Sequence, residues 1–383
     1  MTDAITIRTV EKTTAVEQDL WDGLANPKGE AYNPFLRFDF FDALEKSGSA
    51  VQETGWQPCH LIAENTEKEI IGILPNYIKN HSQGEYVFDH AWADAYYRHG
   101  LDYYPKLQAC VPFTPATGRR LLANGQEDTQ KMLLSGFQQM TQKLDFSSAH
   151  ITFCTEQEAE IANQLGWIKR HGQQFHFNND GFEKFDDFLE RLASRKRKDI
   201  RKERAQAQKD IDIQWKTGSE ITEVDWDIFF DFYMDTGERK WGTPYLTRSF
   251  FSLIGQSMSE DILLILAYEN GKAIAAALNF IGSDCLYGRY WGCNCFRPAL
   301  HFELCYYQAI DYAIAHKLSR VEAGAQGAHK IARGYAPTQT YSAHYIADPR
   351  FCNAIDHFVT SETEHIEMEN RYLSQRTPFK KSP

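Results

Sequence analysis

The sequence lacks the features that most quickly assign a chain to a class of protein. Its eight cysteines form no CxxC pair and have no regular spacing, so we expect neither a zinc site nor a disulfide framework. No apolar run approaches the length of a membrane-spanning helix, and the opening MTDAITIRTVEK has neither the basic start nor the apolar core of a signal peptide. GxSxG, HExxH and the protein-kinase motifs are also absent, which excludes those hydrolase, zinc-protease and kinase classes. We therefore expect a cytoplasmic protein with reduced, mostly buried thiols, no bound metal and no integral membrane association.

Positive charge is also scarce. The 383 residues carry 41 Lys and Arg against 52 Asp and Glu, a formal net charge of −11. This balance argues against a general nucleic-acid binder, although a local basic patch can override the total. Aromatic residues are plentiful at 14% of the chain, which favours wide stacking surfaces or deep pockets. The length gives room for two domains, each with a core of its own.

The stretch 285–346 has the pattern of a strand, a helix and a second strand. Residues 285–293 are a short aromatic run of strand type, and residues 319–323 form a second strand that Gly324 closes. Between them, apolar residues recur at steps of three and four and share one stripe of a helix over 300–317. We expect strand 286–292 to run parallel to strand 320–323, with the helix on one face of the sheet.

Polar residues crowd just beyond the second of these strands, where parallel sheets of α/β proteins bind their ligands. They are Glu322, Gln326, His329, Lys330, Arg333 and Tyr335. We therefore predict the active site there. Lys330 and Arg333 would share one face of a helical turn and orient a carboxylate or phosphate of the substrate. The alternative is that both are surface charges.

The order of elements occurs twice along the chain. Residues 34–44 are echoed by 244–254, and the strand pair at 58–78 corresponds to a hairpin at 262–281 whose turn contains Asn270-Gly271. Each copy reads helix, helix, strand, strand, strand, helix, strand, helix, strand, which indicates two similar domains. We place the join in the Asn178-Asn179-Asp180-Gly181 turn and predict domains of residues 1–179 and 180–383.

Five stretches of the chain resemble one known family. They are GEYVFDHAWADAYYRHGLDYYPKL, VPFTPATGRRLL, SRKRKDIRKERA, LHFELCYYQAIDYA and GAQGAHKIARGYAPTQTYSAH, and they resemble the FemAB-like family of N-acyltransferases. The resemblance covers nearly the whole chain and implies an α/β (α+β) fold of two tandem GNAT-like domains with mixed sheets. It also implies transfer of an acyl or aminoacyl group to an amine, with a peptidoglycan precursor as a candidate acceptor. Ala328 stands where the GAQGxHK pattern is expected to carry an acid, and the alternative function is non-catalytic recognition of a peptidoglycan-type or peptide ligand.

The resemblance leaves the acyl donor open. GNAT enzymes hold the pyrophosphate of acyl-CoA on a glycine-rich loop at the start of the helix after the third core strand. The corresponding loops here, 113–119 and 293–299, keep one glycine and none, and their prolines lack an N–H donor. Acyl-CoA and aminoacyl-tRNA both remain candidate co-substrates, with no permanently bound cofactor. Arg119, Arg120 and Arg297 either bind a phosphate or are solvated charges at helix starts.

Two further segments are candidate binding surfaces. The block 194–204 has seven basic residues against two acids, and it would contact a phosphate-bearing donor or substrate, or else form a solvated interdomain helix. The segment 89–104 mixes aromatic and acidic side chains, and it would hold a sugar or an aminated peptide, or else pack on the first domain. The oligomeric state stays open, and the expected partners are a small-molecule or muropeptide substrate and a candidate tRNA donor.

Acyl transfer to an amine needs a group that takes the proton from the attacking nitrogen. The predicted catalytic candidates are His301, Glu322 and His329, each with a structural hydrogen-bonding role as the alternative. The predicted substrate-binding residues are Tyr97, Lys106, Arg197, Arg201, Tyr290, Glu303, Gln326, Lys330 and Arg333.

Overall fold

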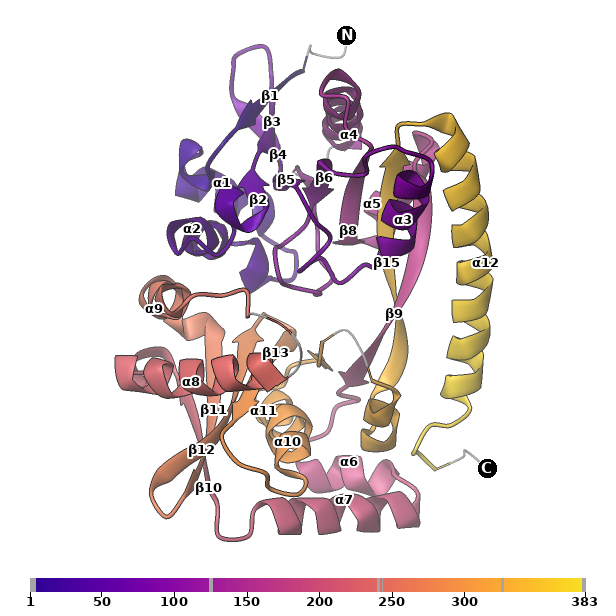
Figure 1. Cartoon of the computed structure of the whole chain (residues 1–383). Coiled ribbons are helices and arrows are strands. Elements are labelled where there is room, and N and C mark those ends of the chain that lie inside the picture. The colour runs from indigo at the N-terminus through magenta and orange to yellow at the C-terminus, as the bar shows by residue number, and fades with distance from the viewer. Residues whose placement is uncertain (1–4, 124–126, 240–241, 243, 325–326, 381–383) are drawn as a thin grey trace. The chain divides into compact units, whose positions relative to one another are not determined.

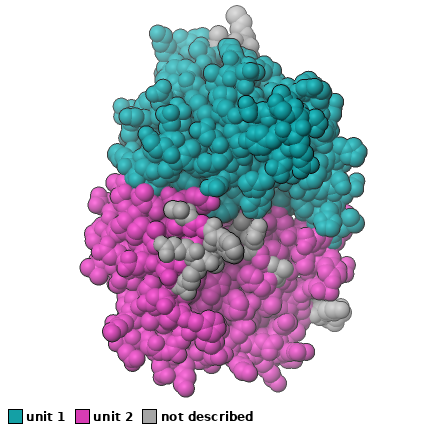
Figure 2. Space-filling model, viewed as in Figure 1, with its two compact units in different colours: residues 1–30, 35–172, 339–368 teal, residues 31–34, 173–338, 369–383 magenta. Residues whose placement is uncertain are grey.

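The computed structural model describes residues 5–123, 127–239, 242, 244–324 and 327–380 of a mixed α/β protein. The chain forms two compact units, which Figure 2 colours separately. Unit 1 comprises residues 1–30, 35–172 and 339–368, and unit 2 comprises residues 31–34, 173–338 and 369–383. The units are not contiguous in sequence, and the division of the chain into domains 1–179 and 180–383 stays a prediction.

Unit 1 is built from strands of two sheets together with helices (Figure 1). Its strands are β1 (Thr6–Val10), β2 (Trp56–Pro58), β3 (His60–Glu64), β4 (Ile70–Leu74), β5 (Asn76–Lys79), β6 (Lys106–Ala109), β7 (Leu122–Ala123) and β8 (Ser148–Cys154). Its helices are α1 (Gln18–Ala25), α2 (Phe38–Lys46), α3 (His90–Arg98), α4 (Glu127–Lys143) and α5 (Glu156–Gln164). Three elements belong to both units along the chain: β9 (Ile168–Asn178), β15 (Ala336–Ile346) and α12 (Pro349–Ser374).

The larger group of strands in unit 1 has one apolar and one polar face. The strand order is β15-β8-β6-β5-β2, in which β6 and β8 are parallel, while β1, β3, β4 and β7 form a separate antiparallel sheet. Leu107 and Ile151 point into an apolar core with Phe137 of α4. Because side chains alternate along a strand, the intervening residues Gln108 and His150 lie on the opposite face, where both are buried.

Unit 2 repeats this arrangement with longer strands. Its own strands are β10 (Asp212–Thr217), β11 (Ile262–Glu269), β12 (Lys272–Ile281), β13 (Cys285–Cys293) and β14 (Arg320–Glu322). Its helices are α6 (Phe185–Arg191), α7 (Ser194–Ala207), α8 (Glu223–Arg239), α9 (Arg248–Ser257), α10 (Leu300–Phe302) and α11 (Gln308–Ala315). The strand order is β10-β11-β12-β13-β14-β9, and only β13 and β14 are parallel among the pairs that the structure describes in this unit.

The predicted strand–helix–strand unit is confirmed. Leu286 pairs with Val321 in a parallel ladder, and both enter a core that contains Leu304 and Ile310 from the intervening helix. The predicted hairpin is also present, because β11 and β12 are joined by Asn270 and Gly271, which have φ values of 51° and 74°. The expected regular helix is interrupted between α10 and α11 by a π-helical turn, η6 (Glu303–Tyr307). Such turns shift the facing side chains by one residue and often occur at functional sites.

Candidate active site

The parallel strands β13 and β14 run side by side and then part. Their ladder ends at the pair Tyr287–Glu322, whereas β13 continues along β12 to Cys293. A Cβ built on Gly288, just past the ladder, would lie 3.5 Å from the carbonyl oxygen of Glu322 and 3.7 Å from the Cα of Ala323. In the part of the chain that the structure describes, no strand pairs with β13 on this side beyond Tyr287. We call this place, β13 past Tyr287 and the residues that follow β14, the β13–β14 divergence.

A row of polar side chains crosses three strands at the divergence. Tyr287 on β13, Glu322 on β14 and His176 on β9 are paired in register, so they lie on the same face of the sheet. Glu322 is 4% exposed, and its Oε1 accepts a hydrogen bond from Arg320 Nε at 3.3 Å. Its Oε2 lies 3.9 Å from His176 Nε2 and has no hydrogen-bond partner among the described residues. An unsatisfied buried carboxylate oxygen is unfavourable by about 1–3 kcal/mol or more, so it marks a place where a hydrogen-bond donor is expected to bind.

Burial determines the charge states next to Glu322. It lowers the pKa of His176 below its ordinary value, so this imidazole is neutral at pH 7. His176 Nε2 also lies 3.1 Å from Gln174 Oε1, an acceptor, which assigns the ring proton to Nε2. Burial likewise raises the pKa of Tyr287 well above its usual range and keeps the phenol protonated. The Glu322 carboxylate is therefore the acceptor in this row, and its neighbours are neutral.

Lys330 lies on η7 (Ala328–Arg333), the short helical turn after β14. Its Nζ donates hydrogen bonds to the carbonyl oxygens of Ala323 at 2.6 Å and Gly324 at 3.0 Å, and the residue is 2% exposed. Burial lowers the pKa of Lys330 to about 8. These two bonds hold the amine against the main chain where it leaves β14, and a substrate-binding role for Lys330 stays a prediction.

Arg333 and His329 lie on the same turn, and both have partners within the protein. Arg333 donates to both carboxylate oxygens of Glu203 at 3.0 Å and to the carbonyl oxygen of His329 at 2.9 Å. Its guanidinium also lies over the ring of Phe302, 3.4 Å from the centroid. His329 is exposed, and its Nε2 is 2.9 Å from the Tyr306 hydroxyl. Arg333 thus connects η7 to α7. Of the two side chains, Arg333 is buried and His329 is exposed to solvent.

Glu303 occupies the start of the π-helical turn and is fully buried. Its carboxylate accepts hydrogen bonds from Arg204 at 3.0 Å, Gln208 at 2.8 Å and Gln308 at 2.7 Å. Arg204 also bonds Asp311 at 2.5 Å. These contacts join α7 to the helix after β13. The Glu303 carboxylate, which was predicted to bind substrate, thus holds two helices together.

His301 and Tyr290 are held by aromatic contacts. The His301 ring packs edge-on against Trp291, with centroids 5.2 Å apart, and against Tyr306 at 5.6 Å. The Tyr290 ring meets Tyr233 of α8 edge-on at 5.3 Å. Both residues are half-buried and border β13 past its ladder, as the sequence predicted for a site at this strand.

The basic block forms α7, and its charges are divided between packing and solvent. Arg201 is exposed and pairs with Asp186 at 3.0 Å, and Arg197 is half-buried. Exposed pairs of this kind contribute little to stability, about 0–1 kcal/mol. In the loop before α10, Arg297 pairs with Glu269. A phosphate contact for these arginines stays a prediction.

Lys106, predicted to bind substrate, lies in the polar face of unit 1 and is fully buried. Its Nζ donates to Ser82 at 3.0 Å, to Glu85 at 2.7 Å and to Asp89. Burial alone would lower the pKa of Lys106, but the carboxylates of Asp89 and Glu85 raise it above its ordinary value. The aromatic segment therefore packs on unit 1 and supplies counter-charges for this lysine. Tyr97, on the same segment in α3, is 52% exposed.

Hydrogen bonds continue from Asp89 across the polar face of unit 1. The Tyr103 hydroxyl donates to Asp89 at 2.7 Å and lies 3.1 Å from His150 Nε2. His150 Nδ1 lies 2.8 Å from His344 Nδ1, so β6, β8, β15 and the aromatic segment share one buried chain of polar groups. Burial lowers the pKa of His150 to about 3, which keeps it neutral. This face is closed by its own side chains.

Residues 113–120 of unit 1 occupy the place after β6 where a GNAT enzyme would bind phosphate. Arg120 is 1% exposed and donates to the carbonyl oxygens of Thr152 at 3.1 Å and Ala116 at 2.8 Å. Arg119 donates to the carbonyl oxygens of Leu24 and Ala123. Both guanidinium groups therefore fix the main chain of unit 1, and neither presents a solvated charge at a helix start.

Sequence reasoning missed His176, whose place beside Glu322 depends on the register of β9 against β14. That register is not local, and no motif around residue 176 indicates it. Gln326 lies outside the described residues. Of the predicted set, Glu322 and Lys330 lie at the β13–β14 divergence, Tyr290 lies farther along β13, and His301 contacts Trp291 of that strand. Tyr97 and Lys106 belong to the other unit.

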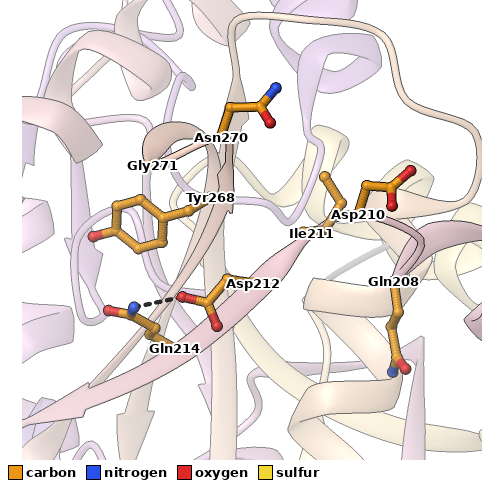
Figure 3. Close-up of a pocket in the computed structure, with 8 residues that line it drawn as sticks. All are labelled: Gln208, Asp210, Ile211, Asp212, Gln214, Tyr268, Asn270 and Gly271. Atoms are coloured by element: carbon orange, nitrogen blue, oxygen red, sulfur yellow. Dashed lines mark hydrogen bonds between the residues drawn. The ribbon is translucent and has the colours of Figure 1, made fainter.

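A separate hollow of about 650 Å³ lies at the edge of unit 2 and is drawn in Figure 3. It is lined by Gln208, Asp210, Ile211, Asp212, Gln214, Tyr268, Asn270 and Gly271. Asp212 and Tyr268 pair across β10 and β11, and Gln214 donates to Asp212 at 2.6 Å. None of these residues belongs to the divergence, since β12 lies between β11 and β13 in the strand order.

The described residues contain neither a cluster of metal-ligating side chains nor a membrane-spanning helix. No group of three or more His, Cys, Asp or Glu side chains there is arranged to hold a metal ion. No helix in the described ranges is long and apolar enough to cross a membrane.

The fold resembles that of several solved structures. FemX matches with a TM-score of 0.55 at 12% identity, over 91% of this chain and 100% of that one. L-PGS from Bacillus licheniformis matches with a TM-score of 0.51 at 8% identity, over 87% of this chain and 99% of that one. A tandem GNAT protein from the clavulanic acid biosynthesis pathway gives 0.46 at 10% identity, over 90% and 99%. The chain therefore shares the mixed α/β fold of FemX and L-PGS, and the predicted fold class is confirmed.

The family follows from the sequence itself. The model of the FemAB-like family, described as peptidoglycan biosynthesis/recognition, matches residues 12–381. The chain therefore belongs to the FemAB-like family, and the predicted resemblance is confirmed. A search of the curated proteins finds no match.

Proposed function

We propose that this protein is an N-acyltransferase whose reaction takes place at the β13–β14 divergence of unit 2. Membership of the FemAB-like family supports a transferase related to peptidoglycan. The observation that carries the proposal is the buried Glu322 carboxylate at the end of the β13–β14 ladder, whose Oε2 lies 3.9 Å from His176 Nε2 and has no hydrogen-bond partner among the described residues. A carboxylate in this state can accept a proton from a bound amine.

The proposed reaction joins an amine to an activated carbonyl. The amine nitrogen attacks the carbonyl carbon, and Glu322 takes the proton that the nitrogen loses, a role that typically contributes 10²–10⁴-fold in rate. The C–S bond of a thioester donor or the C–O bond of an aminoacyl ester then breaks, and the departing thiolate or alkoxide takes up a proton. A backbone N–H of β13 at the divergence, near Gly288, would donate to the developing oxyanion. Glycine suits this position because it lets a substrate approach the main chain closely. His176 holds a neutral N–H next to the carboxylate and helps to orient it.

The proposed acceptor is an amine on the peptide of a peptidoglycan precursor, and the proposed donor is acyl-CoA or an aminoacyl-tRNA. The contacts of Arg119 and Arg120 with backbone carbonyls speak against a phosphate site in unit 1. We therefore propose that the donor binds in unit 2, with the exposed cations of α7, such as Arg201, available for its phosphates.

The test is a transfer assay with acetyl-CoA and aminoacyl-tRNA as alternative donors and a UDP-linked muropeptide as acceptor, with products detected by mass. The proposal expects a product from one donor, and Glu322→Gln should lower kcat by about 100-fold or more while the melting temperature stays close to wild type. Binding of muropeptide without product from either donor would favour the alternative, recognition without catalysis. A rate that Glu322→Gln leaves unchanged would remove Glu322 from the reaction.

A further inference from the structure

The structure describes three lysines that are at most 2% exposed, and they differ in their partners. Lys106 donates to two carboxylates, Glu85 and Asp89, and Lys79 lies 4.0 Å from Glu85. Lys330 contacts only main-chain carbonyl oxygens, and no carboxylate of the described residues is within ion-pair distance of it. A buried ammonium without a counter-charge is unfavourable, and burial lowers its pKa.

The hydrogen bonds of Lys330 leave a lone pair available in those molecules whose amine is neutral, which are the minority at pH 7 because the pKa is about 8. A neutral amine has two N–H donors and one lone pair, whereas an ammonium has three donors and no lone pair. The carbonyl oxygens of Ala323 and Gly324 accept both N–H groups at 2.6 Å and 3.0 Å. The lone pair of nitrogen then points away from these two acceptors, and it is nucleophilic.

The groups around Lys330 do not supply negative charge. His176 on β9 and His329 on η7 are imidazoles whose pKa values are lowered by burial, so they are neutral at pH 7. Arg333 on η7 is a cation that is paired with Glu203. Cys305 on η6 is the one group that favours the cationic lysine, and burial outweighs it, so that the pKa of Lys330 falls to about 8.

The amine is also in the right place. It is bonded to the carbonyl of Ala323, and the Cα of Ala323 lies 3.7 Å from a Cβ built on Gly288, the position that borders the divergence. We propose that the amine of Lys330 is itself acylated by the activated donor that the site binds, so that Lys330 is a self-acylation site. This inference rests on the proposed function for the identity of the donor, and on the contacts of Lys330 for the reactive group.

The step balances without a further reactant. The Lys330 nitrogen attacks the carbonyl carbon of a thioester or an aminoacyl ester, the C–S or C–O bond breaks, and the nitrogen's proton passes to the leaving thiolate or alkoxide. The product is a stable amide with one N–H and no basic lone pair. One of the two main-chain hydrogen bonds is then lost and the acyl group lies at the divergence, so self-acylation should slow transfer to other amines.

The experiment uses the full chain with two probes in separate reactions at pH 7.5, acetyl-CoA and p-nitrophenyl acetate, followed by peptide mass spectrometry. Lys202, exposed on α7, and Lys106, buried and ion-paired, are controls within the same molecule. Lys330 should be acetylated about tenfold faster than Lys202 because far more of it is neutral at this pH, and Lys106 should stay unmodified. The rate at Lys330 should rise with pH up to about 8 and then level, whereas the rate at Lys202 should keep rising.

Each outcome decides a different part of the account. Labelling of Lys330 by the ester but not by acetyl-CoA supports the reactive amine and removes acetyl-CoA as donor. Labelling of Lys202 by both probes with Lys330 unmodified overturns the inference. Transfer to a free amine while Lys330 stays unmodified also overturns it and leaves the proposed function intact. The Lys330→Arg variant should melt at the same temperature as wild type. Its mass spectrum should lack the labelled peptide that contains residue 330, and the labelling of the other lysines should be unchanged.

Discussion

The polar faces of the two units show how the same strand arrangement can be closed or left open. In unit 1, Lys106 has two carboxylate partners, and the loop after β6 is fixed by Arg120, whose guanidinium donates to main-chain carbonyls. In unit 2, Glu322 keeps an oxygen without a hydrogen-bond partner among the described residues, and Lys330 is bonded to carbonyls alone. Buried carboxylate oxygens without a hydrogen-bond partner among the described residues also occur in unit 1, on Glu85 and Asp89, so the difference lies in the lysines. Lys106 is paired with two carboxylates, whereas Lys330 is bonded to carbonyl oxygens.

This difference explains which unit can carry chemistry. A buried lysine that is paired with carboxylates holds its proton tightly, as the raised pKa of Lys106 shows. A buried amine without a counter-charge has a shifted pKa, and a buried carboxylate oxygen without a donor lacks a hydrogen bond. A bound substrate can supply the missing partner. Unit 1 therefore serves as a structural copy in this account, and unit 2 serves as the reactive one.

The largest effect should come from breaking the charge cluster of unit 1. Lys106→Met leaves Glu85 and Asp89 buried without their cation, and we expect a loss of about 3–5 kcal/mol in the free energy of unfolding. The matched change in unit 2, Lys330→Met, removes no ion pair, so it should lose only about 1–2 kcal/mol. Urea unfolding of both variants measures this, and equal losses would contradict the comparison.

A smaller effect is expected where α7 meets the π-helical turn. Arg204→Met removes the charge partner of the fully buried Glu303, which keeps its bonds from two glutamines, so we expect a loss of about 2–3 kcal/mol. Arg201→Met on the same helix is the control, because its pair with Asp186 is exposed and should change stability by about 0.5 kcal/mol or less. Thermal unfolding would refute the assignment if both variants melted alike.

The smallest effect is a pH dependence in unit 1. Burial raises the pKa of Glu85 from 4.5 to about 7, so between these pH values the folded protein holds a proton that the unfolded chain has released. The stability of the wild type should therefore fall as pH rises from 4.5 to 7. Glu85→Gln lacks this proton, and it should gain about 1 kcal/mol per pH unit relative to wild type within the same window. Melting temperatures of both proteins at pH 5 and pH 7.5 measure the difference, and a constant difference would speak against a raised pKa.

Much of the fold could be predicted because it depends on local patterns. The three-and-four spacing from Leu300 onward and the Asn270-Gly271 turn each specify their own element, and the short connection through a helix requires parallel strands. The neighbourhood of Glu322 and Lys330 followed from the same rule, since residues past parallel strands gather at one edge of a sheet.

The rest of the site depends on contacts between residues far apart in the sequence. His176 meets Glu322 through a strand register that no local pattern encodes, and Lys106 finds Glu85 and Asp89 through the fold of the aromatic segment. The π-helical turn was missed as well, because the stripe of apolar residues fits a regular helix. Glu303, which accompanies the turn, was predicted to bind substrate and is fully buried. The charge states of the buried groups were the hardest property to predict from the sequence, because each depends both on burial and on the charged partners of the group.

The same substitution in each unit tests the central claim most directly. Glu322→Gln and Glu85→Gln both replace a buried glutamate by its neutral isostere, one at the divergence of unit 2 and one in the charge cluster of unit 1. With the donor and acceptor that give product, the account predicts that Glu322→Gln loses about 100-fold or more in kcat, while Glu85→Gln stays within about twofold of wild type. A large loss in Glu85→Gln with wild-type turnover in Glu322→Gln would place the chemistry in unit 1 and contradict the account.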